Sequence, residues 1–563
     1  MVQIEFPGEQ SSVPEVAATL PTSDDPTLPV MTFRFWFIGT IFLVFSAAVA
    51  QFMYFRQVPV QLNNFSVILM TYPMGVFMAK VMPDWRVGFH WPFDFIFARG
   101  TFIGGSLNPG PFNIKEHTLI VVAASTNNNA AYATDILTIQ RLYYGPSQNP
   151  NNVGWAAALL LIWTTQCIGY GFAGLVRDWL VYPAAMWWPS NLVIGNLLHV
   201  FHAKANEGLV ADRIKLFNKL TTWVVIYEFL PQYFAPYLAR VSIFCLMWGS
   251  LKGKLGNPIL YPPENLANVN NGGGLGFLTF DWQQITAFGP MFTPFWAQMN
   301  VIIPIFVSTW IVAPWMYKKN IWSANMYPLT SPGNFDVNGD VYNVSKILNN
   351  RTLEVDDGKY ANYSQLRLST YWALLYGSNF AVITAILVHV ALFFGKELVD
   401  GIRASRTENE DVHIKIMRKY PEVPSTWYLV TLGKIPPFAF SPNFPPVSQW
   451  WGILFALSTV VVFIVPIGIV QAISNVQIGT NVITEFIFGL AVPGKAIANV
   501  CFKTYGYTSM SQGLALVQDL KLGVYMKIPP KAMFICQMYA TIIGGVVNYA
   551  VMNELIIHVP DIW

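Results

Sequence analysis

Long runs of apolar residues separated by short polar stretches are the dominant pattern of this chain. A run of about 20 such residues can cross the hydrocarbon core of a bilayer as an α-helix. The strong runs are Phe35–Tyr54, Phe65–Met82, Thr118–Thr138, Val153–Val176, Trp179–Val200, Asn300–Tyr317, Thr370–Gly395, Trp450–Gln471 and Ala532–Met552. Weaker runs are Leu216–Phe234, Leu238–Ser250 and Asn481–Val500. The pattern predicts an all-α integral membrane protein.

One shorter apolar segment departs from this pattern. Phe93–Leu107 is too short to cross a bilayer and carries Asp94 and Arg99, so we predict a half-helix or re-entrant segment here. With it, the chain has about thirteen membrane segments at about 20 residues per full span. The predicted fold is therefore a polytopic helical bundle.

Two signals predict how the bundle is oriented. The loop 318–368 holds three N-glycosylation acceptors, at Asn343, Asn350 and Asn362, which are used only on the extracytoplasmic side. The loop 396–424 is rich in lysine and arginine, which is typical of cytoplasmic loops. We therefore expect a cytoplasmic tail at 1–34, a first membrane half at 35–317, an extracytoplasmic loop at 318–368 and a second membrane half at 369–563.

Composition excludes several classes of protein. Charged residues make up 11% of the chain, against about 25% in soluble domains, and a net charge of +3 gives no basic surface for nucleic acid. The four cysteines form no close pairs that would indicate a metal site. The phosphate-binding Gly-x4-Gly-Lys-Ser/Thr loop is missing, as are the His-Glu-x-x-His and Gly-x-Ser-x-Gly motifs of hydrolases. We expect no cofactor, no ATP-driven step and no enzymatic activity.

The segment Asn108-Pro-Gly-Pro-Phe-Asn-Ile-Lys-Glu-His117 carries the most informative chemistry. It places a cation, an anion and a histidine at the start of an apolar run, after a helix-breaking Pro-Gly-Pro. Ionisable groups at membrane depth cost about 2.5–3.5 kcal/mol each on insertion scales, and they mark ion or substrate pathways. Broken helices are tolerated there only where they line a cavity or are buried in protein. We predict a transporter in which residues 108–129 border a water-filled vestibule.

The three charged or titratable residues of this segment are predicted to have different roles. Lys115, Glu116 and His117 point about 100° apart on a helix, so one cavity cannot receive all three. Histidine titrates near neutrality, and burial raises the pKa of a glutamate toward it. We therefore assign Glu116 and His117 to proton coupling, and Lys115 either to a substrate carboxylate or to a nearby acid. The alternative is an interfacial ion-pair cluster that fixes the start of the helix.

Polar amides surround the same helix break. Asn108 and Asn113 flank free backbone amides that suit an anionic group such as a peptide carboxylate, or they cap the helix. Three more amides lie within an apolar run, where they line a cavity and bind substrate or bond to other helices. These are Asn127, Asn128 and Asn129.

A second set of polar residues lies near the other end of the chain. Asn481-Val-Ile-Thr-Glu485 echoes the pattern of Asn113 to Glu116, and Pro493-Gly-Lys495 gives a further helix break. Transporters built of two repeats place discontinuous helices at matching positions. We assign Glu485 to proton coupling, and Asn481 and Asp135 to substrate binding. The alternative for Glu485 is a structural ion pair.

In these and other segments the chain resembles the oligopeptide transporter family. The matching segments are Asp24–Arg34, Asn108–His117, Ala131–Asp135, Tyr182–Met186, Leu278–Trp282, Pro466–Gly468, Asn481–Phe486, Pro493–Lys495, Phe502–Gly506 and Lys527–Pro530. The resemblance implies a helical bundle built from repeats. It also implies proton-coupled uptake of peptides of about three to five residues, glutathione or metal–ligand complexes. Lys527-Ile-Pro-Pro-Lys531 is predicted to be a loop that fixes the start of the last helix.

Two alternatives to a peptide symporter remain at this point. One is a carrier of metal chelates from the related yellow-stripe branch, although the motifs match the peptide branch better. The other is a shortened, non-transporting member, because the family usually continues with further spans whereas this chain ends at Trp563. The glycan acceptors favour the plasma membrane over vacuolar or other internal membranes.

Overall fold

Helices make up most of the structure, a computed structural model that describes residues 10–55, 61–90, 102–143, 154–202, 208–235, 289–329, 333–349, 354–396, 411–433 and 450–559, with 238, 282, 286 and 331. The earlier helices are α1 (Pro14–Thr19), α2 (Phe33–Tyr54), α3 (Asn64–Val81), α4 (Ile114–Ser125), α5 (Ala133–Tyr143), α6 (Trp155–Leu180), α7 (Pro189–His202) and α8 (Gly208–Phe229). The later helices are α13 (Phe295–Phe306), α14 (Ala313–Lys318), α15 (Asp357–Tyr363), α16 (Thr370–Phe393), α18 (Val412–Met417), α19 (Ser425–Gly433), α20 (Trp450–Ser474), α21 (Asn481–Ala491), α22 (Ala496–Lys503), α23 (Ser509–Tyr525) and α24 (Pro530–His558). Single π-helical turns at Leu230–Phe234, Val307–Val312 and Thr504–Thr508 continue α8, join α13 to α14 and join α22 to α23.

Seven of the described helical segments are long and apolar enough to cross a membrane. They are Phe33–Tyr54, Asn64–Val81, Trp155–Leu180, Phe295–Lys318, Thr370–Phe393, Trp451–Ser474 and Pro530–His558. Each coincides with a strong apolar run of the sequence, so these seven predicted spans are confirmed. Apart from Leu238, the predicted span Leu238–Ser250 lies outside the described residues. The total number of membrane segments and the two-repeat arrangement stay predictions.

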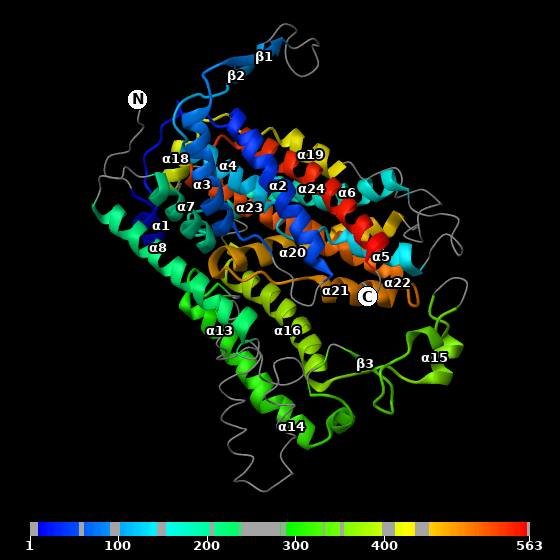
Figure 1. Ribbon diagram of the computed structural model, residues 1–563. Coiled ribbons are helices and arrows are strands. Elements are labelled where there is room, and N and C mark those ends of the chain that lie inside the picture. Colours follow the sequence, from blue (N-terminus) through cyan, green and yellow to red (C-terminus); the bar gives the residue numbers. More distant parts are fainter. Residues whose placement is uncertain are drawn as a thin grey trace.

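The long helices pack into one bundle, in which α23 has a central place (Figure 1). α23 packs against α6, α20 and α24, while α2 packs against α4 and α24. Two large apolar clusters form the core, one centred on α6 and α20 and the other on α2 and α4. Both α23 and α24 contribute side chains to each cluster. The two helices therefore join the two halves of the core.

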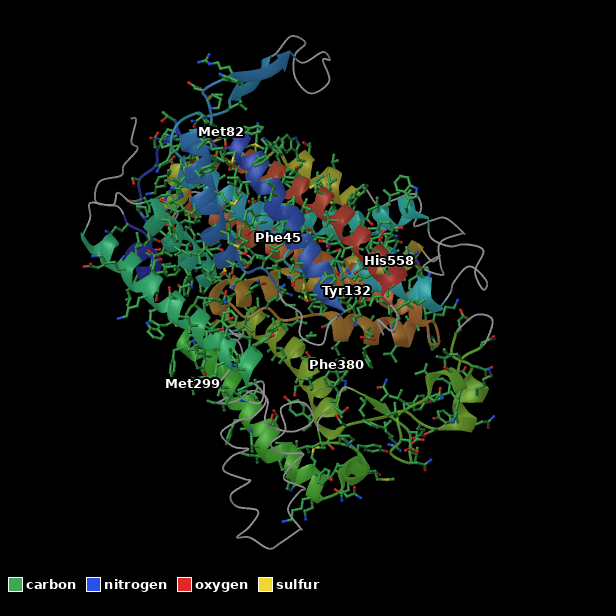
Figure 2. All side chains as sticks on the ribbon, in the orientation of Figure 1. Phe45, Met82, Tyr132, Met299, Phe380 and His558 are labelled. Atoms are coloured by element: carbon green, nitrogen blue, oxygen red, sulfur yellow. The ribbon has the colours of Figure 1, made fainter. Side chains whose placement is uncertain are left out.

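Two apolar segments extend away from the bundle. Phe295–Lys318 and Thr370–Phe393 are each only 17% buried, and Figure 1 shows α14 and the adjoining part of α16 beyond the other helices. Their exposed apolar side chains suit contact with lipid, because lipid tails need no polar partners. Side chains fill the spaces between ribbons in the bundle itself (Figure 2).

Three predicted spans are each two separate elements. Thr118–Thr138 divides into α4 and α5, because the Ser125–Asn129 run of short polar side chains favours turns over helix. Trp179–Val200 divides into the end of α6 and α7, which begins at Pro189 after Trp188 with a φ of 51°. Asn481–Val500 divides into α21 and α22 at Gly494, whose φ is 83°.

The half-helix predicted over Phe93–Leu107 is wrong in its described part. Residues Phe102–Ser106 form strand β2, which pairs antiparallel with β1 (Arg86–His90). Gly104 and Gly105 disfavour a helix here, since glycine loses the most backbone entropy when it is ordered. The hairpin extends past Met82 at the end of α3 (Figure 2). A second pair, β3 (Asn334–Phe335) and β4 (Arg367–Leu368), lies in the loop that holds the glycan acceptors.

The N-terminal segment and the glycan-acceptor loop lie at different ends of the structure. α1 and α18 lie at one end of the bundle, whereas α15 and β3 lie at the other (Figure 1). The Tyr420 hydroxyl donates a 2.7 Å hydrogen bond to Asp24, so the N-terminal segment contacts the described part of the basic loop 396–424. The contact is compatible with a shared side of the membrane for the two segments, which stays a prediction.

Candidate functional site

The start of α4 is built by two asparagines around a glycine turn. Asn113 caps the helix, because its side-chain oxygen accepts a 3.0 Å hydrogen bond from the Glu116 amide. Asn108 donates to the carbonyls of Ala79 and Met82 at the end of α3. Between them Gly110 has a φ of 125°, which a residue with a side chain rarely adopts. The amides that could have received an anionic substrate group are therefore already partly occupied by capping.

Glu116 faces the start of α2. Its carboxylate receives two hydrogen bonds of 2.9 Å from the Nε and Nη2 groups of Arg34, and a further one from the Thr32 hydroxyl. Neither Arg34 nor Glu116 has an exposed side chain. The remaining Arg34 nitrogen, Nη1, donates to Asn108 at 3.1 Å and to the Gly110 carbonyl at 2.7 Å. One arginine thus holds the helix break and the acid after it in fixed positions.

Lys115 points toward the N-terminal segment. Its Nζ atom lies 2.7 Å from an Asp24 carboxylate oxygen and donates to the Asp25 carbonyl at 2.8 Å and to the Tyr420 hydroxyl at 2.9 Å. The Tyr420 hydroxyl donates in turn to Asp24. Burial and the Asp24 hydrogen bond raise the pKa of Tyr420. Of the two partners predicted for Lys115, the structure contains the nearby acid.

His117 forms a pair with another histidine. Its Nδ1 atom lies 3.0 Å from Nε2 of His202 on α7, and its Nε2 atom lies 3.0 Å from the Thr71 hydroxyl on α3. Tyr72 and Phe112 enclose the two rings. One ring nitrogen must donate and the other accept, and the arrangement changes when a proton is added or removed.

The predicted divergence of the three side chains agrees with these contacts, since each of residues 115–117 faces a different element. Lys115 is 3% exposed, and Glu116, His117 and Thr118 are fully buried. The water-filled vestibule that the sequence predicts therefore does not adjoin these side chains in this conformation, because they are packed directly against protein.

The amides at the end of α4 bond to other helices. Asn127 donates to the Ala540 carbonyl on α24 at 2.9 Å. Asn128 accepts from Ser46 on α2 and donates to Asn64 on α3. These are the interhelical bonds given above as the alternative to a cavity lining. Asn129 is exposed and accepts a 2.7 Å hydrogen bond from Gln61.

Residues predicted to act in different parts of the chain meet around Lys503. The Glu485 carboxylate lies 3.2 Å from Lys503, and the lysine packs on the ring of Tyr132 with 5.8 Å between Nζ and the ring centre. Asp135, which accepts a 2.8 Å hydrogen bond from Tyr54, lies within electrostatic range of the same lysine. Asn481 is half-buried at the start of α21. α5, α21 and α22 thus share one polar cluster.

Nearly the whole chain matches a transporter family. The sequence profile described as "OPT oligopeptide transporter protein" matches residues 30–563. The chain belongs to the oligopeptide transporter family. It is 38% identical over 564 residues to oligopeptide transporter 1 of Arabidopsis thaliana, an alignment that covers 98% of this chain and 71% of that protein. It is 35% identical over 573 residues to glutathione transporter 1 of Schizosaccharomyces pombe, covering 98% of this chain and 64% of that protein.

The family assignment makes this transporter a multi-pass membrane protein, as the apolar runs predict. Among the described residues, no group of three or more His, Cys, Asp or Glu side chains is arranged to hold a metal ion. Asn343 and Asn362 are exposed, as glycan acceptors must be, while Asn350 lies outside the described residues.

Several residues of the transporter's polar interior were not predicted as sites. Arg34, His202 and Lys503 contact predicted residues, and Arg34 could have been found as a lone cation immediately before the first apolar run. Asp519 and Lys521 lie on α23, a core helix that the apolar runs of the sequence do not predict. Its polar residues lower the hydropathy below that of a lipid-facing span, yet they are directed at protein groups. Lys521, for example, is fully buried and donates to the Val181 and Pro183 carbonyls.

Proposed function

We propose that this transporter is a proton-coupled symporter of glutathione and peptides of about three to five residues. Its relatives include proteins named as oligopeptide transporters and one named as a glutathione transporter. Glutathione is itself a tripeptide, so one polar pathway suits both kinds of substrate.

The main support for proton coupling is the buried His117–His202 pair. The two rings meet at 3.0 Å on α4 and α7, inside an apolar core and beside a broken helix. A histidine pair is able to gain or lose a proton near neutral pH, provided that a change of conformation admits water. Glu485, with its exposed face beside Lys503, is a second candidate for the coupling path. Glu116 has a firm structural role through Arg34, and its part in coupling is the least supported of the three.

We propose that the substrate binds along the polar residues of α4, α5 and α21. Alternating access requires the packed segment 108–129 to separate from α2 or α7 in another conformation, which would expose Lys115 and the amides near it. We place the N-terminal segment and the loop 396–424 in the cytoplasm and the loop 318–368 outside, in the plasma membrane. The contact of Tyr420 with Asp24 supports the first of these placements.

Uptake of labelled glutathione and a labelled tetrapeptide in a transport-deficient host tests the proposal. We expect uptake that a protonophore abolishes. His117→Gln should flatten the pH dependence of uptake, whereas His558→Gln, at an exposed position near the end of α24, should leave it unchanged. Uptake insensitive to the protonophore would exclude proton coupling, and no uptake at all would favour a non-transporting member of the family.

A further inference from the structure

Asp519 is an acid at the centre of the bundle that the function proposed above does not use. It lies on α23, at the junction of the two apolar clusters. Its carboxylate accepts a hydrogen bond from the side-chain amide of Gln537 on α24. Among the described residues no cation pairs with it. Three other acids of the described interior do have a cation: Glu116 has Arg34, Asp24 has Lys115 and Glu485 has Lys503.

The orientation of Gln537 is fixed by the hydroxyl groups on its other side. Its side-chain oxygen accepts hydrogen bonds from Thr126 at 2.9 Å and from Tyr170 at 3.3 Å. A side-chain amide oxygen only accepts hydrogen bonds, so the amide nitrogen must face Asp519. The network therefore presents one donor to one carboxylate oxygen and leaves the second oxygen of Asp519 free for a proton.

Among the described residues, the elements packed against α23 place no cation in contact with Asp519. Arg177 on α6 pairs instead with Asp178 and Glu422. The ionisable groups within its electrostatic range are Tyr170 on α6 and Cys536 on α24, both of which are ordinarily neutral at physiological pH. α18 contributes Asp411 and His413, and α7 contributes His199. These three interact instead with Lys521 and Lys527, which project from other parts of α23 and the turn after it. α20 and the Thr504–Thr508 turn add no charged side chain.

Asp519 also remains accessible. It is only half-buried, although helices surround α23. An unpaired carboxylate in an apolar interior is stabilised by carrying a proton, and hydration favours its release. A carboxyl group in this position can thus hold a proton in a closed conformation and lose it when water enters.

We propose that Asp519 is a proton-binding site of the transporter that carries the coupling proton, with Gln537 as the residue that positions its carboxyl group. The role in coupling rests on the proton-coupled symport proposed above, whereas the binding of a proton by Asp519 does not. Thr126 joins the network to the end of α4, and Tyr170 joins it to α6. Protonation of Asp519 therefore acts on the contacts between the two halves of the core.

Infrared difference spectroscopy of the purified full-length transporter tests proton binding without any substrate. We expect a protonated-carboxyl band that is lost as the pH is raised through the neutral range and that is missing in Asp519→Asn. Asp212→Asn, an exposed acid on α8, is the matched control and should retain the band. An Asp519→Asn spectrum identical to the wild type would overturn the proposal.

A variant that leaves Asp519 in place covers the case in which Asp519→Asn does not fold. Gln537→Leu removes the donor that stabilises the charged carboxylate, so the titration midpoint of the band should move to higher pH. Asp519→Glu retains a carboxyl group and should retain a titrating band. An unchanged midpoint in Gln537→Leu would contradict the positioning role of Gln537.

Transport in proteoliposomes separates this proposal from the proposed function. Asp519→Asn should lose peptide accumulation driven by a pH gradient but keep the exchange of labelled for unlabelled peptide at equal pH. Accumulation that persists in Asp519→Asn would exclude Asp519 as the coupling site. If the wild type neither accumulates nor exchanges peptide, the proposed function fails, and the infrared band still decides whether Asp519 binds a proton.

Discussion

Arg34 and Glu116 form a fully buried ion pair through two parallel hydrogen bonds of 2.9 Å. The pair joins the first turn of α2 to the first turn of α4, two helices that are distant in sequence. Because the same guanidinium also bonds to Asn108 and the Gly110 carbonyl, it fixes the whole helix break. Removing either partner would leave a charge without compensation in an apolar interior.

Replacement of Arg34 alone by methionine should therefore destabilise the transporter more than replacement of both Arg34 and Glu116 by apolar residues. Breaking a buried pair costs about 3–5 kcal/mol, whereas replacing both partners by apolar residues is often close to neutral. Thermal denaturation of the detergent-solubilised protein measures the difference between Arg34→Met and the double variant Arg34→Met/Glu116→Leu. An equal decrease in stability in the single and the double variant would contradict this prediction.

The Tyr420 hydroxyl offers a milder test of the contact between the N-terminal segment and α4. It accepts from Lys115 and donates to Asp24, so Tyr420→Phe removes two hydrogen bonds to charged groups. We expect a loss of about 2–3 kcal/mol in stability and faster proteolysis of the N-terminal segment. Tyr233→Phe is the control, since Tyr233 is 78% exposed. Equal proteolysis rates in the two variants would refute the contact.

Much of the fold was predictable because a lipid-facing helix must be apolar along its whole length. The seven confirmed spans follow from that rule alone. The turn at Lys527 was also predictable, since the following Pro529 and Pro530 favour the first turn of a helix, and α24 does begin at Pro530. The divergence of residues 115–117 followed from helix geometry.

The interior of the bundle was less predictable, because protein groups can satisfy polar residues that lipid cannot. α23 carries Asp519 and Lys521 and therefore does not resemble a membrane span, yet Lys521 is satisfied by two carbonyls. The break after Ser125 looked like part of one helix because the residues on either side are apolar. The pairing of Arg34 with Glu116 could not be deduced either, since hydrophobic periodicity carries no information about which helices are neighbours.

Gly544 should not tolerate a side chain. A Cβ atom at this position of α24 would overlap the amide of Asn127, which is held by its own hydrogen bond to the Ala540 carbonyl. Gly544→Ala should thus lower stability by about 1–3 kcal/mol, the usual effect of overpacking. Gly377→Ala on α16, where no atom lies within 4 Å of the added Cβ, should change stability by less than about 1 kcal/mol. Fluorescence-detected thermal unfolding of both variants measures the contrast, and equal midpoints would disprove the predicted overlap.

His413 should make the transporter less stable in acid. Burial, together with Lys527, Lys521 and His199, lowers the pKa of His413 to about 3. Below its ordinary pKa of 6.5 the unfolded chain takes up a proton that the folded chain does not, so stability is complete above that pH and falls as the pH decreases toward 3. At about pH 5 the loss from this residue is about 2 kcal/mol. The free energy of unfolding of His413→Gln, measured across this pH range, should depend less on pH than that of the wild type. The same dependence on pH in both proteins would contradict the predicted role of His413.

Asn343 and Asn362 should each carry an N-linked glycan if the loop 318–368 is extracytoplasmic. Both side chains are exposed. The Asn343 side-chain oxygen accepts a hydrogen bond from the Ser345 amide, which does not involve the amide nitrogen that a glycan would modify. Asn343→Gln and Asn362→Gln should each increase mobility on a denaturing gel by one glycan, and endoglycosidase should remove the difference. Asn325→Gln, at an exposed asparagine outside any acceptor motif, is the control and should not change the mobility. If neither acceptor is modified in a host that glycosylates this class of loop, the predicted orientation of the bundle is wrong, and the N-terminal segment and the loop 396–424 would then face away from the cytoplasm.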